Sequence, residues 1–174
     1  MSNYIINARN TIIVNTKDNY ALIITNKKEE VLIDIDDIEK VKNSTWYING
    51  ARHKYAVAKI KNKNVKLHRL IMNVLDMDYK MVQVDHINGN TLDNRKCNLR
   101  LVTPQQNSFN KSKNNFGKNK HNGVHYMKDK CKWRAYITYN GKWIHLGMYE
   151  TEDEAIIARI KAEEKYYGEY RRKS

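Results

Sequence analysis

The chain has 174 residues, of which 32 are Lys or Arg and 19 are Asp or Glu, so that its formal net charge at pH 7 is +13. This length suits one medium domain or two small ones and excludes a large catalytic barrel or a doubly wound sheet. A charge of this size attracts polyanions, which makes nucleic acid the expected partner, with plain solubility as the alternative.

The lack of a long apolar run and the spacing of the two cysteines exclude membrane-spanning, disulfide-rich and zinc-ribbon proteins. No apolar run approaches the roughly 18 residues that span a bilayer, and the N-terminus lacks the layout of a signal peptide, so we expect a cytoplasmic protein with no membrane partner. Cys97 and Cys131 are far apart and have no C-x-x-C partner. They therefore exclude a disulfide framework and a four-cysteine zinc ribbon, and no zinc is expected.

The first part of the chain is rich in short β-forming runs separated by Asn, Asp, Lys and Gly, which is typical of antiparallel strands. A short helix within residues 36–42 interrupts them, Asn49-Gly50 indicates a tight hairpin turn, and Leu67–Met72 predicts a short helix. The expected strands are Thr11–Val14, Tyr20–Thr25, Glu30–Ile35, Trp46–Ile48 and Tyr55–Ile60. We therefore expect one small antiparallel sheet before the helix.

A carboxylate and an imidazole stand side by side at the end of the next expected strand, Met81–His86. Neighbours on a strand point to opposite faces, so Asp85 and His86 can do different jobs. A polar loop follows, and Asn98–Val102 predicts a return strand.

The return strand leads into a predicted helix. Thr103 is a suitable cap, Pro104 suits the first helical position, and Asn107 then lies on the first turn. Strand, loop, strand and helix would bring Asp85, His86, Asn98 and Asn107 into one site.

These four residues outline a metal-assisted hydrolase of phosphodiesters. A carboxylate and an amide oxygen suit Mg²⁺, and a neutral histidine suits the general base. Each residue alone has an ordinary explanation, because an Asp-His pair in a loop is more often a turn or a surface pair.

The wider pattern resembles the HNH, or ββα-metal, homing endonucleases. The matching stretches are Leu67-His68-Arg69, Val84 to Asn90, Leu92 to Arg95, Asn98 to Arg100, and Thr103 to Asn107. The resemblance implies an α+β fold in which the N-terminal sheet leads into a ββα-metal nuclease core. It also implies that the partner is double-stranded DNA.

The resemblance also assigns roles to residues. It implies that His86 is the general base, that Asn98 orients it, and that Asp85 and Asn107 hold one divalent metal, Mg²⁺ or Mn²⁺. Family members with histidine at the last metal position differ from this chain, so Asn107 must act as a neutral ligand and the affinity for metal should be modest. His68 is expected to support the fold, and Arg69 or Arg100 to contact a phosphate.

The rest of the chain predicts a separate module. We expect the nuclease core at about residues 65–112 within a first domain of residues 1–112, then a basic linker at 113–121 and a second domain at 122–174. The second domain should be a three-stranded antiparallel sheet packed on one helix. Its expected strands are Gly123–Met127, Trp133–Tyr139 and Lys142–Tyr149, and its helix Glu152–Tyr167 should begin with a Thr151–Glu154 capping box and end at Gly168.

This module resembles the DNA-binding domain of plant ethylene-response factors, on Trp133 to Ile137, Leu146 to Tyr149 and Thr151 to Ala155. The resemblance implies that the outward sheet face binds the major groove. By position, the DNA contacts would be His125, Lys130, Lys132, Arg134, Tyr136, Thr138, Trp143 and His145. Trp133 is instead expected in the core, and replacement of family arginines by His125, Met127 and Thr138 implies a different target sequence.

We therefore expect a site-selective endonuclease of the homing type, encoded by a phage or mobile element. One such centre cuts one strand, so a double-strand break would need a second protomer or a second visit. A DNA-binding regulator that has lost catalysis and a restriction endonuclease with the same chemistry are the alternatives.

Overall fold

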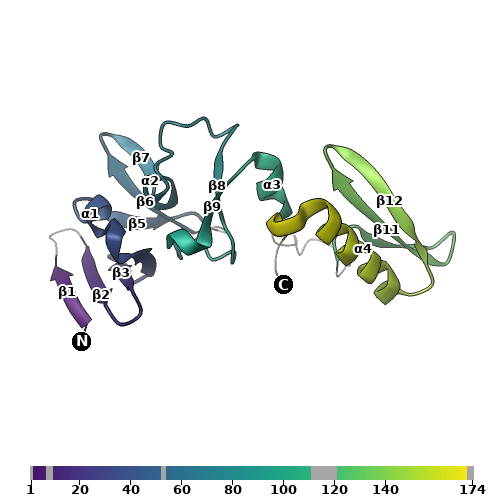
Figure 1. The fold of residues 1–174 in the computed structure, drawn as a ribbon, viewed down its shortest axis with the longest axis horizontal. Helices are drawn as coiled ribbons and strands as arrows, with labels where there is room; N and C mark the ends of the chain where they lie inside the picture. The colour runs from purple at the N-terminus through teal and green to yellow at the C-terminus, as the bar shows by residue number, and fades with distance from the viewer. Residues whose placement is uncertain (1, 7–9, 52–53, 111–120, 172–174) are drawn as a thin grey trace. The chain divides into compact units, whose positions relative to one another are not determined.

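A computed structural model describes residues 2–6, 10–51, 54–110 and 121–171 (Figure 1). The chain divides into two compact units, residues 1–104 and 105–174, and each is described by itself. Apart from His121, the predicted linker at 113–121 lies outside the described residues. Both units combine small antiparallel sheets with few helices, and none of the described helices is long and apolar enough to cross a membrane.

A four-stranded antiparallel meander opens the first unit. Its strands are β1 (Ser2–Ile6), β2 (Thr11–Asn15), β3 (Tyr20–Ile24) and β4 (Glu30–Asp34), paired in that order. Every second side chain of β2, β3 and β4 is buried, as expected when alternate residues face one core.

The remaining strands of this region form a second sheet, so the expectation of a single sheet is wrong. It contains β5 (Trp46–Asn49), β6 (Tyr55–Ile60) and β7 (Lys63–Lys66). A 3-10 turn η1 (Ile35–Asp37) and helix α1 (Ile38–Val41) separate it from β4. The indole of Trp46 is buried and donates a 3.0 Å hydrogen bond to the carbonyl of Val41.

The tight turn of the second sheet also differs from the prediction. Asn49-Gly50 begins a longer connection to Tyr55, whereas Lys61 and Asn62 alone join β6 to β7. Their φ angles of 47° and 63° are both left-handed, which matches the twist of two-residue hairpins.

The predicted strand–strand–helix order is present in the next segment. Helix α2 (Leu67–Ile71) precedes β8 (Gln83–His86), which pairs antiparallel with β9 (Leu99–Val102) after the 3-10 turn η2 (Lys96–Asn98). Helix α3 (Pro104–Phe109) begins at the predicted proline. Because α3 belongs mainly to the second unit, the ββα-metal arrangement stays a prediction.

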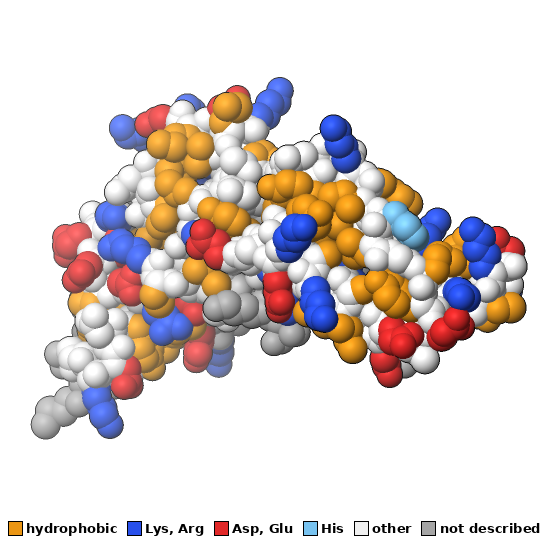
Figure 2. Space-filling model, turned by 45° about the vertical axis from the view of Figure 1, so that its right-hand side comes forward, with side chains coloured by type: hydrophobic (Ala, Val, Ile, Leu, Met, Phe, Trp, Pro, Cys, Tyr) orange, Lys and Arg blue, Asp and Glu red, His pale blue; other side chains and the backbone are white. Residues whose placement is uncertain are grey.

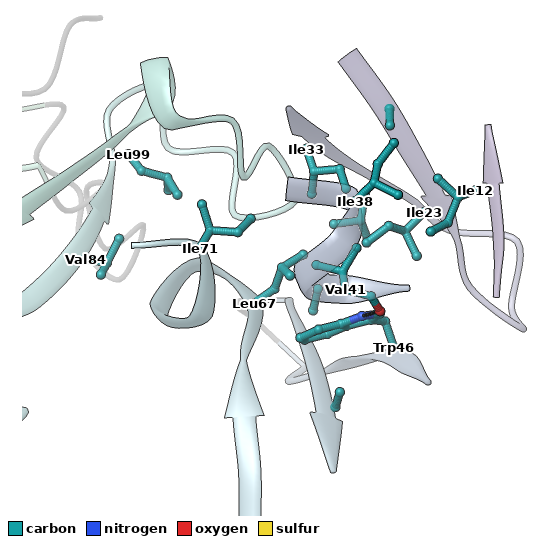
Figure 3. Packing of buried hydrophobic residues seen from close by; sticks show 14 of the residues in the cluster. Ile12, Ile23, Ile33, Ile38, Val41, Trp46, Leu67, Ile71, Val84 and Leu99 are labelled. Carbon is teal, nitrogen blue, oxygen red and sulfur yellow. Dashed lines mark hydrogen bonds between the residues drawn. The ribbon is translucent and has the colours of Figure 1, made fainter. Parts of the chain in front are cut away.

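One apolar core joins these parts of the first unit (Figure 3). It runs from Ile12 and Ile23 of the N-terminal sheet past Trp46 and Leu67 to side chains of β8 and β9. Val84 and Leu99 belong to it, so the β8–β9 pair rests on the same core as the N-terminal sheet.

Backbone contacts tie the N-terminal sheet directly to the loop after β8. Leu32 on β4 forms a parallel bridge with Asp93, with its N–H donating to the carbonyl of Leu92 at 2.9 Å and its carbonyl accepting from Asn94 N–H at 2.8 Å. The N–H of Lys96 also donates to the carboxylate of Asp34. The N-terminal sheet therefore supports this loop.

The second unit has the predicted sheet and helix. Its sheet is β10 (Val124–Met127), β11 (Lys132–Tyr139) and β12 (Lys142–Tyr149), followed by α4 (Glu152–Tyr167) and a 3-10 turn η3 (Gly168–Tyr170). The Thr151–Glu154 capping box is present. Ala135 and Ala155 are fully buried where α4 packs on the sheet, and Trp133 packs against this core as expected.

Helix α3 packs with this second unit. The ring of Phe109 stacks on that of Tyr167, with centroids 3.9 Å apart and planes 9° apart. Gln105 Nε2 donates to Asn140 Oδ1 at 2.7 Å. The division between the two compact units falls between Pro104 and Gln105, and the predicted domain boundary at about residue 112 stays a prediction.

Candidate active site

Asp85 and His86 end β8 and are both buried, with 7% and 5% of their surfaces exposed. Asp85 lies opposite Arg100 on β9, and its Oδ2 accepts from Arg100 Nε at 2.9 Å and Nη2 at 2.7 Å. Arg100 therefore balances the charge of Asp85. The expectation that Arg100 contacts a phosphate did not anticipate this pairing.

His86 lies among other rings. The ring centroid of His68 is 5.1 Å away, edge to face, and that of Tyr55 is 6.2 Å away. Burial lowers the pKa of His86 below its ordinary value, although the Asn94 side chain and the charges of Asp85 and Asp93 oppose this shift. His86 is therefore neutral near pH 7, as a general base must be.

The imidazole of His68 is buried beside His86 and is neutral. Burial, helped by nearby His86, Lys66 and Arg69, lowers the pKa of His68 to about 2. The expectation that His68 supports the fold stays a prediction.

The side chain of Asn98 is bound to the loop rather than to His86. Its Oδ1 accepts from the N–H of Asn88 at 2.9 Å, and its Nδ2 donates to the carbonyl of Asp93 at 2.8 Å. The residue whose amide reaches the imidazole is Asn94, with Oδ1 3.4 Å from His86 Nε2. The family resemblance implied that Asn98 orients His86, and Asn94 was not among the predicted site residues.

Asp93 organises the same loop. Its carboxylate accepts from Arg95 Nε at 2.8 Å and Nη2 at 2.7 Å, and from Asn88 Nδ2 at 3.1 Å. These hydrogen bonds hold the pKa of Asp93 below its usual range. The loop after β8 is thus cross-linked by charge-assisted hydrogen bonds.

Arg69 is also bound within the protein. Only 5% of its surface is exposed, and its guanidinium donates to the carbonyls of Val74, Met77 and Val82. Three carbonyls on one guanidinium fix the segment between α2 and β8. Arg69 thus has a structural role in this segment, and its expected contact with a phosphate stays a prediction.

The two predicted metal ligands are the carboxylate of Asp85 and the side-chain amide of Asn107. Within the described ranges, no three or more His, Cys, Asp or Glu side chains are grouped to hold a metal. One carboxylate with an amide oxygen suits Mg²⁺, which keeps several waters. Asn107 lies on α3, mainly in the second unit, so its pairing with Asp85 stays a prediction.

The outward face of the second sheet brings predicted DNA contacts together. The rings of Tyr136 and Trp143 stack with centroids 4.2 Å apart and planes 11° apart, and His125 stacks on Tyr136 at 5.5 Å and 10°. The Arg134 guanidinium lies 5.7 Å from the Tyr136 ring and 6.0 Å from that of Trp143. We call these four residues the aromatic stack; its end, Trp143, is 66% exposed.

The other predicted contacts lie around this stack. Thr138 on β11 and His145 on β12 are exposed, as is Lys130 in the turn before β11, and Lys132 pairs with Glu150 at 2.8 Å. Figure 2 shows Lys and Arg side chains spread over the face in view rather than gathered in a single patch.

Comparison with known proteins agrees with the strand–loop–strand region. The sequence pattern of a family described as HNH endonuclease matches residues 77–109, which include Asp85, His86, Asn98 and Asn107. No solved structure matches.

Two relatives come from viruses. An uncharacterized HNH endonuclease of Acanthamoeba polyphaga mimivirus is 32% identical over 157 residues, which cover 87% of this chain and 78% of that protein. Protein 3.8 of Escherichia phage T7 is 36% identical over 59 residues, which cover 34% of this chain and 49% of that protein. With a relative this similar over most of both lengths, and with Asp85 and His86 buried side by side, the chain belongs to the HNH endonuclease family.

Proposed function

We propose that this protein is a metal-dependent, site-selective DNA endonuclease of the homing type, in which His86 is the general base. The observation that carries the proposal is a buried, neutral imidazole directly beside a buried carboxylate at the end of β8. A base of this kind takes a proton from the water that attacks the phosphodiester.

Asp85 and Asn107 are the proposed ligands of one Mg²⁺ or Mn²⁺ ion. Such an ion, when bound, would stabilise the charge that develops on the leaving 3′ oxygen. Asp85 contributes a hard carboxylate oxygen, and two hydrogen bonds from Arg100 orient that carboxylate. Asn98 holds the loop around the site through Asn88 and Asp93.

The second unit is the proposed DNA-reading module. The aromatic stack offers rings and a guanidinium on one exposed face, and exposed aromatics of this kind normally mark a contact surface. Duplex DNA is the proposed ligand, and one active site per chain would nick one strand.

A DNA-binding protein that does not cut is the second candidate. The Asp85–Arg100 pair favours it, because the proposed metal ligand already has a cationic partner. A restriction endonuclease would share the chemistry of the first candidate.

A plasmid assay separates cutting from binding. Supercoiled plasmids carrying candidate sites are incubated with Mg²⁺ or Mn²⁺, with chelator, and with the variants His86→Ala and Asn90→Ala. We expect nicked circles from the wild type and from Asn90→Ala, because the Asn90 side chain lies in the same loop and accepts from the backbone N–H of Leu92. Absence of nicking by the wild type, or equal nicking by His86→Ala, would overturn the proposal.

A further inference from the structure

Asn94 is the most buried polar side chain of the loop after β8, with 1% of its surface exposed. Its Oδ1 faces His86 Nε2 at 3.4 Å, while its Nδ2 has no hydrogen-bond partner within the described parts of the chain. A buried, unpaired amide destabilises a fold, and an apolar residue of the same shape would avoid that penalty. Among the described residues, the contact with His86 is the interaction that requires the Asn94 amide.

The backbone holds Asn94 firmly in place. Its N–H donates to the carbonyl of Leu32 at 2.8 Å, and its neighbour Asp93 forms the bridge to β4. Asn98 Nδ2 donates to the carbonyl of Asp93, the residue before Asn94. The amide of Asn94 is therefore presented by the N-terminal sheet and has little freedom to move away from the imidazole.

The identity of the facing atoms decides which ring nitrogen carries the proton. A carbonyl oxygen accepts hydrogen bonds, so an amide that presents Oδ1 to Nε2 favours the neutral tautomer protonated at Nε2. That tautomer leaves the lone pair on Nδ1. We propose that Asn94 is a positioning residue that holds His86 protonated at Nε2, so that Nδ1 is the atom that accepts the proton from water.

This inference rests on the proposed nuclease function and deepens it. It assigns the orientation of His86 to Asn94 rather than Asn98. Because the N–H of Asn94 donates to the carbonyl of Leu32, β4 then helps to hold His86 in place. A purely structural role for Asn94 would predict that an isosteric apolar substitution changes the melting temperature, because the unpaired amide is removed, but leaves kcat for nicking unchanged.

The test uses Asn94→Leu, which keeps the shape and removes both polar atoms, and Asn94→Asp, which keeps an acceptor. Asn90→Ala is the matched control for disturbance of the loop. The first readout is the tautomer of His86 in full-length, metal-free, ¹⁵N-labelled protein, from long-range ¹H–¹⁵N spectra in which the His86→Ala spectrum identifies the signals. The second readout is kcat and KM for nicking, and the third is the melting temperature.

We expect the wild type and Asn94→Asp to show the Nε2–H tautomer and Asn94→Leu to show a mixture. Asn94→Leu should melt no lower than the wild type, yet its kcat should fall about 10- to 100-fold with KM for DNA unchanged. Wild-type His86 protonated at Nδ1, or Asn94→Leu with the wild-type kcat, would overturn the inference. If the wild type cuts no DNA, the proposed function fails, and the tautomer measurement still decides whether Asn94 orients His86.

Discussion

Arg100 donates from both Nε and Nη2 to one oxygen of Asp85, Oδ2, at 2.9 and 2.7 Å. The pair is largely buried, with side-chain exposures of 15% and 8%. A cation bound to Asp85 must therefore share this carboxylate with a guanidinium that is always charged.

Arg100→Ala should separate stability from metal binding. Removal of the guanidinium leaves Asp85 buried without its ion-pair partner, so the free energy of unfolding without metal should fall by about 3 kcal/mol. The affinity for Mn²⁺, measured by calorimetry, should rise, because the metal no longer competes with Arg100. A weaker affinity for Mn²⁺ would contradict this account, and Arg100→Ala combined with Asp85→Asn is the control that removes both charges.

His68 should make stability depend on pH. Its pKa is lowered to about 2 in the folded protein, whereas the unfolded chain protonates near the ordinary value of 6.5. Stability is therefore fully present above pH 6.5 and is lost as the pH falls, by up to about 1.4 kcal/mol per pH unit. Urea unfolding between pH 7.5 and 5 should show this slope in the wild type and in the exposed control His145→Ala, but a smaller one in His68→Phe.

Trp143→Ala should weaken DNA binding without harming the fold. The side chain is 66% exposed, so the free energy of unfolding should change by less than about 0.5 kcal/mol. Loss of a ring that contacts DNA should reduce affinity about tenfold in fluorescence anisotropy, with no change in salt dependence since no charge is removed. Ile157→Ala is the control: it replaces an exposed apolar residue of α4 and should bind as the wild type does. Unchanged affinity in Trp143→Ala would remove the aromatic stack from the DNA interface.

Phe109→Ala should destabilise the second unit selectively. Phe109 stacks on Tyr167 and lies 6.1 Å from the ring of Tyr139, so its loss removes the main apolar contact that α3 makes there. Amide hydrogen exchange should accelerate in α3 and α4 and stay unchanged in β8. If exchange in β8 accelerated instead, α3 would belong with the first unit, as the sequence suggested.

The sequence predicts features that depend on local chemistry. The helix start at Pro104, the capping box of α4 and the three strands of the second unit follow from capping preferences and from alternation along strands. The position of Asp85 next to His86 at the end of one strand is also predicted from the sequence.

Features that depend on long-range packing could not be predicted in this way. Leu32 and Asp93 are far apart in sequence, so no local pattern shows that β4 supports the loop after β8. The division of the N-terminal strands between two sheets depends on which strands pair, and a run of β-forming residues does not show this. The same limit explains why Asn94 was missed, because its contact with His86 follows from loop geometry rather than from spacing.

The bridge between Leu32 and Asp93 affects whether the nuclease segment can be transferred into another protein. The family pattern covers residues 77–109, which suggests a cassette that could be moved between proteins. The backbone partners of its loop, however, lie on β4, and the hydrophobic core on which it packs includes side chains of the N-terminal sheet. A transplanted cassette would leave those partners behind, so successful fusions should retain the chain from its first sheet onward.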